Sequence, residues 1–374
     1  MKIKDVASFP VSYELARPFA NSAERHQRRA TTLVKITSDE GISGWGEAYG
    51  PPLGTSNVIQ TYLKPRLIGQ DPFRVEYLWF GLQTHKGIPK GAMGGIDLAL
   101  WDLKARAMNV PVYELLGGRN TGVITPYATG FFLNEDDPDS TKYLEAEVEA
   151  ALSGKFRAIK MKIGFGKARD IKRMKRVREM VGDGVDLMVD ANQAYDYMTC
   201  VELIPCLTDL NVRWLEEPMP WQSFEGYKEL RKKAPFAIAG GEAEYDYQGF
   251  VEAIREHVVD VIQPDLAASG GLTHSRRLAV LAEAFQVDFQ PHVFGTILAL
   301  PGAVQLMAAV TNNQPWMLFP RPVLLEWDTT PNPMTTDVVY NPLTLKDGVL
   351  QVPEGIGIGV DVNEEAIKKY LIEK

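Results

Sequence analysis

The chain has 374 residues, enough for a large barrel with a smaller partner domain. Its formal net charge is −8 and its isoelectric point is about 5.3, which argues against nucleic acid as a general partner. No apolar run approaches the ~20 residues of a membrane helix, and the first residues carry no signal-peptide core. The two cysteines, Cys200 and Cys206, are interpreted as reduced packing residues, so we expect a cytoplasmic protein with no membrane partner.

The sequence of the N-terminal part predicts strands followed by helices. Residues 31–37 predict a strand, and residues 42–47 predict its hairpin partner. Residues 95–104 carry apolar side chains at helical spacing. This order is typical of a small α+β domain, which we place at residues 1–120.

A regular alternation of short β-branched runs and helical stretches follows. The runs end near Tyr127, Lys162, Asp190, Glu216, Glu242, Asp265, His292 and Glu326. Eight such units predict an α/β fold, a (β/α)₈ (TIM-type) barrel over residues 121–330 with its active site at the C-terminal strand ends. A doubly wound sheet is the alternative, but we find no phosphate-binding glycine loop. Residues 331–374 are expected to return to the first domain and pack on it.

Three carboxylates close consecutive predicted strands: Asp190, Glu216 and Glu242. Each alone could be a helix N-cap or a surface residue. In a barrel they would converge on one wall of its mouth, where they repel one another unless a cation lies among them. An all-oxygen set suits Mg²⁺ better than Zn²⁺, with Mn²⁺ as the other possibility.

Lys160 and Lys162 alternate along one predicted strand, so both should face the barrel interior. Close to each other and to a dication, each would have a lowered pKa, which suits a general base at neutral pH. The alternative is that one of the two lysines only pairs with a metal-ligand carboxylate.

On the other side of that wall, Asp265 and His292 end neighbouring predicted strands. The carboxylate can hold the imidazole tautomer and raise its basicity, which gives an Asp–His dyad. Glu326, on the last strand, would be a hydrogen-bond donor or electrostatic partner for a developing oxyanion, or else a structural residue. Such a set would stabilise the enediolate formed when a proton leaves the carbon next to a carboxylate.

In this order the motifs resemble the mandelate racemase subgroup of the enolase superfamily. The resemblance is carried by Lys160-x-Lys162, Asp190-x-Asn192, Glu216-Glu217-Pro218, Gly241-Glu242, Asp265, His292 and Glu326. It implies that Lys162 is the base, that Lys160 contacts the substrate carboxylate, and that Glu216 rather than Glu217 is the ligand. It also implies a homo-oligomer, and a capping domain whose loops close over the barrel mouth.

Further stretches resemble an acid-sugar branch of that subgroup, among them Tyr127-Ala128-Thr129-Gly130 and Pro291-His292-Val293-Phe294-Gly295-Thr296. The expected partner is a small carboxylate, and the expected reaction is β-elimination by a lyase or cycloisomerase on an acid sugar or its lactone. The polar segment at residues 21–29 suits a hydroxylated or doubly acidic substrate. The expected substrate contacts are Asn21, His26, Arg28 and Asn192.

Three alternatives stay open at this point. A racemase or epimerase would use Lys162 and His292 without changing the substrate's formula. A barrel glycosidase would use two glutamates, but it leaves Asp190, both lysines and the Asp–His pair unexplained. A non-catalytic barrel has no need for so many charges in its mouth.

Overall fold

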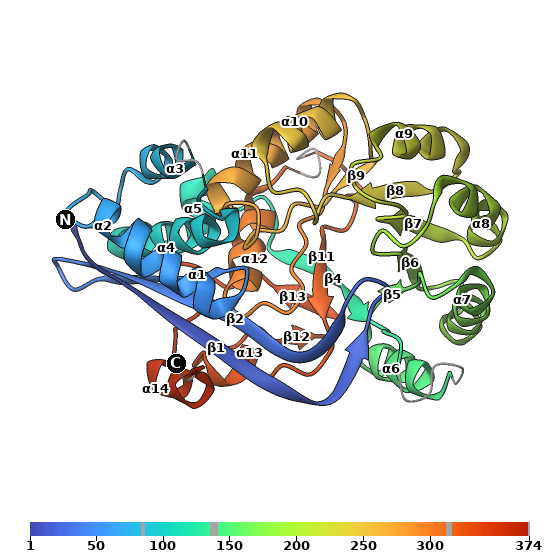
Figure 1. The fold of residues 1–374 in the computed structure, drawn as a ribbon, viewed down its shortest axis with the longest axis horizontal. Helices are drawn as coiled ribbons and strands as arrows, with labels where there is room; N and C mark the ends of the chain where they lie inside the picture. The colour runs from blue at the N-terminus through green and yellow to red at the C-terminus, as the bar shows by residue number, and fades with distance from the viewer. Residues whose placement is uncertain (84–86, 135–140, 312–315, 373–374) are drawn as a thin grey trace.

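The computed structural model describes residues 1–83, 87–134, 141–311 and 316–372. A cap and a (β/α)₈ barrel lie side by side, with the long N-terminal hairpin reaching from one to the other (Figure 1). Within these ranges, no helix combines the length and the apolar character needed to cross a membrane.

The cap begins with a three-stranded antiparallel sheet of β1 (Ile3–Ala20), β2 (Arg25–Ser38) and β3 (Ser43–Ala48). The predicted hairpin is confirmed as β2 and β3. Most side chains of β2 from Thr31 onward are buried, and the β1–β2 tip extends beyond the sheet (Figure 1). There Ala20 forms a bridge to Leu133, in the segment after the first barrel strand. Through the hairpin, the cap therefore contacts the barrel.

The cap helices follow this sheet in the chain, and several of them pack on it. They are α1 (Pro52–Val58), the π-turn η1 (Ile59–Leu63), α2 (Lys64–Leu67), α3 (Val75–Gln83), α4 (Lys90–Met108) and α5 (Val112–Leu116). The predicted helix at residues 95–104 is confirmed inside α4. Gly46 lets β3 lie directly on α4, because a Cβ there would come within 2.2 Å of the Gly95 carbonyl oxygen.

In the part of the chain that the structure describes, the barrel has eight parallel strands. They are β4 (Val123–Gly130), β5 (Ala158–Lys162), β6 (Asp186–Asp190), β7 (Val212–Glu216), β8 (Ala237–Gly240), β9 (Val261–Ile262), β10 (Asp288–Phe289) and β11 (Leu324–Asp328). Neighbours pair in chain order from β4 to β10, and β11 pairs with β4. Between β10 and β11, the Val293 N–H donates to Glu326 at 3.1 Å.

Helices cover the outside of the strands. They are α6 (Lys142–Ser153), α7 (Lys167–Val181), α8 (Tyr197–Asp209), α9 (Phe224–Lys233), α10 (Tyr247–Arg255), α11 (Gly271–Ala284) and α12 (Ala299–Ala309). The strands are buried almost throughout, as expected for a parallel sheet covered on its outer face. A small inner cluster that includes Tyr127, Met188 and Trp214 fills the barrel.

The strand ends differ in detail from the prediction. Lys162, Asp190 and Glu216 are the last residues of their strands, as predicted. β8, β9 and β10 stop before their predicted polar ends, and β4 and β11 run further. Polar residues at a strand end still point into the mouth after the ladder has stopped, so pattern alone cannot fix the last paired residue.

The C-terminal segment contains α13 (Met334–Asp337), β12 (Leu345–Lys346), β13 (Val349–Gln351), α14 (Glu364–Ile367) and a 3₁₀ turn, η2 (Lys368–Tyr370). β13 pairs antiparallel with the start of β4. Further on, Leu371 bridges to Val11 of the cap, and Glu364 lies 2.5 Å from Lys35. The segment therefore contacts the barrel first and the cap afterwards.

Candidate active site

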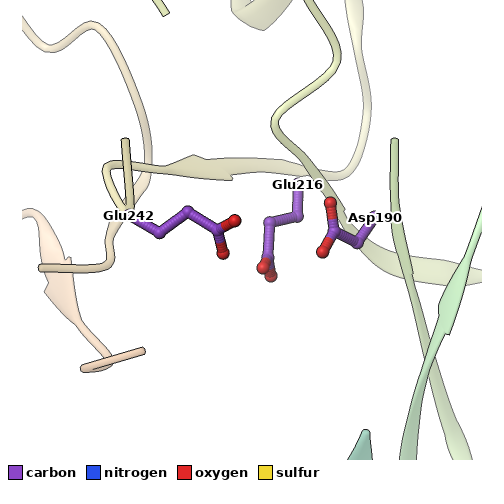
Figure 2. Close-up of side chains that lie close together, drawn as sticks. All are labelled: Asp190, Glu216 and Glu242. Carbon is purple, nitrogen blue, oxygen red and sulfur yellow. The ribbon is translucent and has the colours of Figure 1, made fainter. Parts of the chain in front are cut away.

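Asp190, Glu216 and Glu242 gather at the C-terminal ends of β6, β7 and β8. One carboxylate oxygen from each lies within 4.8 Å of the others. Figure 2 shows the three groups turned toward a shared space. Asp190 and Glu216 are buried, while the Glu242 side chain is 21% exposed. The three residues predicted as a cluster are thus brought together.

The neighbouring donors orient these carboxylates. The Asn192 N–H donates to Asp190 at 2.8 Å, and the Asn192 side-chain amide donates to Glu242 at 3.3 Å. Gln263 donates to the Oε2 atom of Glu216 at 2.8 Å. The oxygen-only donor set fits a divalent cation such as Mg²⁺. A buried oxygen of Glu217 also has no hydrogen-bond partner next to this set.

The two predicted lysines face the same interior. Lys162 forms an ion pair with Asp190, and Lys160 pairs with Glu216 and, at 2.8 Å, with Glu326. Burial alone would lower the pKa of Lys162, but Asp190 raises it above its ordinary value. This is opposite to the lowered pKa expected next to a dication. Each lysine thus brings one positive charge into direct contact with the carboxylate cluster.

The carboxylates carry more negative charge than the lysines balance. Burial and the negative charges of the surrounding carboxylates raise the pKa of Glu216 to about 7. Lys160 lowers this pKa, but it offsets only part of the rise. Burial also raises the pKa of Glu217 well above its usual range, and Glu242 adds to the effect. A bound dication would favour the ionised forms, which is consistent with a metal site.

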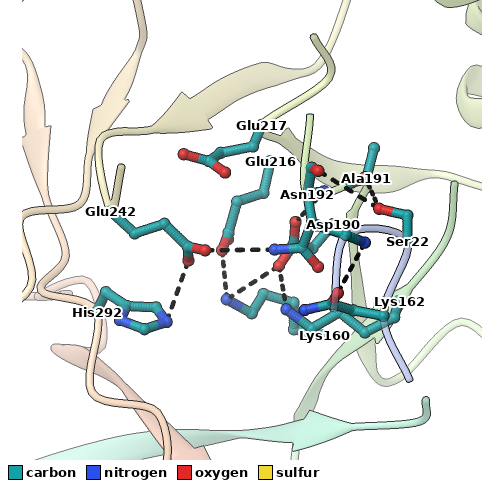
Figure 3. A network of polar contacts seen from close by, with 12 residues as sticks. Ser22, Lys160, Lys162, Asp190, Ala191, Asn192, Glu216, Glu217, Glu242 and His292 are labelled. Atoms are coloured by element: carbon teal, nitrogen blue, oxygen red, sulfur yellow. Dashed lines mark hydrogen bonds and ion pairs between the residues drawn. The ribbon is translucent and has the colours of Figure 1, made fainter. Parts of the chain in front are cut away.

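His292 and Asp265 form the predicted dyad. The Nδ1 atom of His292 lies 2.6 Å from an Asp265 oxygen, and its Nε2 atom lies 3.1 Å from Glu242. Burial would lower the pKa of His292, but Glu242, Glu326 and Asp265 raise it to about 10. Figure 3 shows His292 and Lys162 on opposite sides of the carboxylates. The site therefore presents a nitrogen base or acid on each side.

Glu326 is buried between the two sides. Burial would raise its pKa, but Lys160 and His292 lower it to about 2. It is therefore ionised and accepts hydrogen bonds, including one from the Val293 N–H. Its predicted role as a hydrogen-bond donor or electrostatic partner for the oxyanion stays a prediction.

The hairpin tip lies over this mouth. The Ser22 hydroxyl donates to the Ala191 carbonyl at 2.6 Å (Figure 3). Ala191 lies between Asp190 and Asn192 in the chain. Asn21 accepts hydrogen bonds within its own turn, from the N–H groups of Ala23 and Glu24. The structure therefore gives Asn21 a part in shaping the tip.

His26 belongs to an aromatic cluster at the tip, with Phe19, Phe132 and Phe294. Burial lowers its pKa to about 4, so it is neutral at physiological pH. Lys162 Nζ lies 5.6 Å from the Phe132 ring and 5.9 Å from the Phe294 ring. This side of the mouth is more aromatic than the polar lid expected from the sequence.

Arg28 is exposed on β2, and its neighbour Arg29 is the buried one. Arg29 lies 2.8 Å from Asp328 of β11 and stacks over Phe294 at 4.4 Å. Adjacent strand residues face opposite sides, so only one of the two can reach the barrel. The strand alternation therefore turns Arg28 outward and Arg29 toward β11.

Gln263 was also missed. It lies two residues before Asp265 and reaches the same mouth, where it donates to Glu216. The period-2 rule that placed Lys160 beside Lys162 would have found it.

Comparison with known proteins supports this architecture. Residues 3–117 match the family of the mandelate racemase / muconate lactonizing enzyme N-terminal domain, and residues 143–366 match the enolase C-terminal domain-like family. The chain is 35% identical over 376 residues to the D-galactarolactone cycloisomerase of Agrobacterium fabrum, covering 99% of both chains. It is 29% identical to the arabinonate dehydratase of Saccharolobus solfataricus, covering 98% of this chain and 99% of the relative.

A solved structure is similarly close. The 3,6-anhydro-D-galactonate cycloisomerase from Zobellia galactanivorans superposes with a TM-score of 0.89 at 34% identity, covering 100% of both chains. Together, the matched domains, the barrel with its cap and the relatives agree with the predicted family. The chain is an enzyme of the enolase superfamily and belongs to its mandelate racemase subgroup.

Proposed function

We propose that this enzyme removes the proton next to the carboxylate of an acid sugar or its lactone and completes a β-elimination, as a lyase or cycloisomerase. The observation that best supports this proposal is the position of Lys162 and His292 on opposite sides of the carboxylate cluster (Figure 3). A base on one side and an acid on the other can act on the Cα–H and Cβ–O bonds of one substrate.

Each of these residues has its own role in the proposed reaction. Lys162 Nζ takes the α-proton in its neutral form, which a cation bound to the three carboxylates would favour. Lys160 lies next to the substrate carboxylate. The His292 Nε2–H donates its proton to the departing ring or hydroxyl oxygen, while Asp265 holds Nδ1. The Cα–H and Cβ–O bonds break, the Cα–Cβ double bond forms, and the enol becomes a 2-keto acid.

Asp190, Glu216 and Glu242 are the proposed ligands of Mg²⁺, with Mn²⁺ as a substitute. The bound cation would draw charge from the substrate carboxylate, which makes the α-proton more acidic. Asn192 is proposed to orient the site, because it contacts both Asp190 and Glu242. His26 is the hairpin side chain that we propose for substrate contact, because its Nε2 atom is buried without a partner.

A lactone or anhydro ring is the favoured form of the substrate. Two relatives, at 35% and 34% identity, are named for D-galactarolactone and 3,6-anhydro-D-galactonate. The aromatic cluster next to Lys162 offers an apolar face to the C–H groups of a sugar ring.

The same two-sided site would also support a racemase or epimerase. It would return a proton to the opposite side of Cα through His292 without breaking a Cβ–O bond. The proposed glycosidase alternative finds no support in the family assignment.

The test is NMR in D₂O with Mg²⁺ and D-galactarolactone, followed by pooled aldonic acids, aldaric acids and their lactones. Loss of an α-proton signal with a new keto acid supports elimination. Deuterium exchange with epimerisation alone supports the racemase. No exchange in the whole pool overturns the acid-sugar proposal.

The remaining expectations are the division into residues 1–120, 121–330 and 331–374, a homo-oligomer, and a cytoplasmic location. Sedimentation of the purified protein tests the assembly. Limited proteolysis followed by mass spectrometry tests the division, because exposed connections between domains are cut first.

A further inference from the structure

The helices that follow the two dyad strands, α11 and α12, start without a capping side chain of their own. Their N-cap positions hold Gly270 and Leu298, which have no side-chain oxygen. By contrast, α8 carries a local cap, because Asp196 accepts a hydrogen bond from the Thr199 N–H. The first N–H groups of a helix need an acceptor, so α11 and α12 must be capped from elsewhere.

The acceptor for α12 is Glu47, at the end of cap strand β3. It is 1% exposed. Its Oε2 atom accepts three backbone hydrogen bonds at 2.7, 2.7 and 2.9 Å, from the N–H groups of Ile297, Leu298 and Ala299. Three donors converge on one oxygen at the positive end of the helix, where a carboxylate is favoured.

The acceptor for α11 is Asp97, in cap helix α4. Its two oxygens accept from the Thr273 N–H at 2.8 Å and from the Thr273 hydroxyl at 2.6 Å. The two backbones also touch. A Cβ at Gly94 would lie 2.4 Å from the Ala267 carbonyl oxygen, and a Cβ at Gly271 would lie 2.5 Å from Asp97. α4 therefore supports the whole loop before α11.

That loop contains Asp265 and is stabilised by hydrogen bonds between its own residues. The Asp265 side chain accepts from the Ala268 N–H at 2.7 Å, and its carbonyl accepts from the Ser269 N–H at 2.9 Å. The Gly271 N–H donates to the Leu266 carbonyl at 3.0 Å. A shift at the start of α11 is therefore passed to the carboxylate of Asp265.

The loop that carries His292 is tied in the same way. The N–H groups of Val293 and Gly295 donate to carboxylates of β11 at 3.1 and 3.0 Å. The loop ends at Ile297, Leu298 and Ala299, whose N–H groups donate to Glu47. Lys162 stands on β5, which pairs only with the barrel strands β4 and β6 within the described residues.

We propose that Glu47 and Asp97 are positioning residues that set, from the cap, where His292 and Asp265 stand in the barrel mouth. Each carboxylate holds the far end of one dyad loop. The inference rests on the proposed function, which gives the dyad its acid–base role. It predicts that the two variants weaken chemistry on the His292 side more than on the Lys162 side.

The first readout needs no activity. In protein labelled with [¹⁵N]histidine, the Nδ1–H proton of His292 gives a downfield signal, assigned by its loss in His292→Asn. In Glu47→Ala and Asp97→Ala this signal is expected to shift or broaden. The matched control is Asp102→Ala, another buried cap carboxylate in α4, which accepts from Trp45 and Ile358 outside the dyad loops.

The second readout compares two exchange rates in one sample in D₂O. The probes are D-galactarolactone and its epimer at the carbon next to the carboxylate. In the proposed binding mode, their α-protons face opposite sides of the mouth. The rate on the His292 side is expected to fall about 10- to 100-fold relative to the Lys162 side. This ratio does not depend on the folded fraction. Glu47→Gln keeps the accepting oxygen and is expected to restore the ratio.

An unchanged His292 signal, an equal loss of both rates, or the same changes in Asp102→Ala would overturn the inference. If the unmodified enzyme exchanges neither probe, the proposed function fails on this substrate. The His292 signal then decides the positioning role by itself.

Discussion

Lys162 carries the proposed chemistry of one side of the site, so its removal is the most direct test at the scale of a residue. Lys162→Ala should lower α-proton exchange by about 10²- to 10⁴-fold, the usual contribution of a general base. Binding of Mg²⁺, measured by calorimetry, should be retained, because the three carboxylates remain. Lys167→Ala, an exposed lysine of α7, is the control. Undiminished exchange would exclude Lys162 as the base.

His274 gives a residue-scale prediction about pH. Its side chain is 1% exposed in α11, near Trp79 and Phe250, and burial lowers its pKa to about 4. Lys90 and Arg277 lower the pKa further, while the Ser269 carbonyl and Asp246, as hydrogen-bond and charge partners, raise it.

Between pH 6.5 and 4 the unfolded chain binds a proton at His274 that the folded chain does not. Stability is therefore present above pH 6.5 and is lost as the pH falls through this window, by up to roughly 3 kcal/mol. The measurement is the urea-unfolding midpoint against pH. His274→Asn should flatten this part of the curve, and His257→Asn, at a turn after α10, should not. Identical curves for the parent and His274→Asn would refute the assignment.

At the scale of elements, the hairpin tip is held on the barrel by the pair Arg29–Asp328. Both side chains are largely buried, at 4% and 12% exposure. Arg29→Met keeps most of the volume but leaves the carboxylate without its cation, so the free energy of unfolding should fall by about 3 kcal/mol. Adding Asp328→Asn should recover part of that loss, as measured in a double-mutant cycle by chemical denaturation. Strictly additive losses would show that the two side chains do not stabilise each other.

The element pattern also explains what the sequence could predict. Strand and helix lengths repeat, so Asp190 and Glu216 could be placed at strand ends and then together, because the ends of parallel strands meet. The partners of Glu47 and Asp97 lie 250 and 176 residues away along the chain. No local pattern connects such residues, so the motifs around them were visible but their contacts were not. The direction of a single strand side chain was also hard to predict: Arg28, expected at the substrate, is exposed, and its neighbour Arg29 is buried.

At the scale of the whole molecule, both parts of the chain contribute to the proposed active site. The barrel supplies the carboxylates, lysines and dyad, and the cap supplies the hairpin tip and the acceptors for α11 and α12. The C-terminal segment adds a third tie, since the Ile358 N–H donates to Asp102 at 2.8 Å. A ligand bound at the mouth should therefore stabilise more than the barrel alone.

Divalent cations test this coupling. A cation that binds only the folded chain stabilises it by about 2.7 kcal/mol at 100 times its dissociation constant. We expect Mg²⁺ to raise the melting temperature and a chelator to reverse the rise. Glu242→Gln should weaken the effect, because it removes one charge of the proposed ligand set while its amide can keep the contact with Asn192.

The matched control is Glu354→Gln, whose side chain is 76% exposed beside Arg119. It should respond to Mg²⁺ as the parent does. A Mg²⁺ response of the same size in Glu242→Gln would mean that the cation binds elsewhere, and the carboxylate cluster would lose its role as the metal site. A response that is lost in Glu242→Gln and kept in Glu354→Gln would link the stability of the whole fold to this one cluster, because its ligands come from three neighbouring barrel strands.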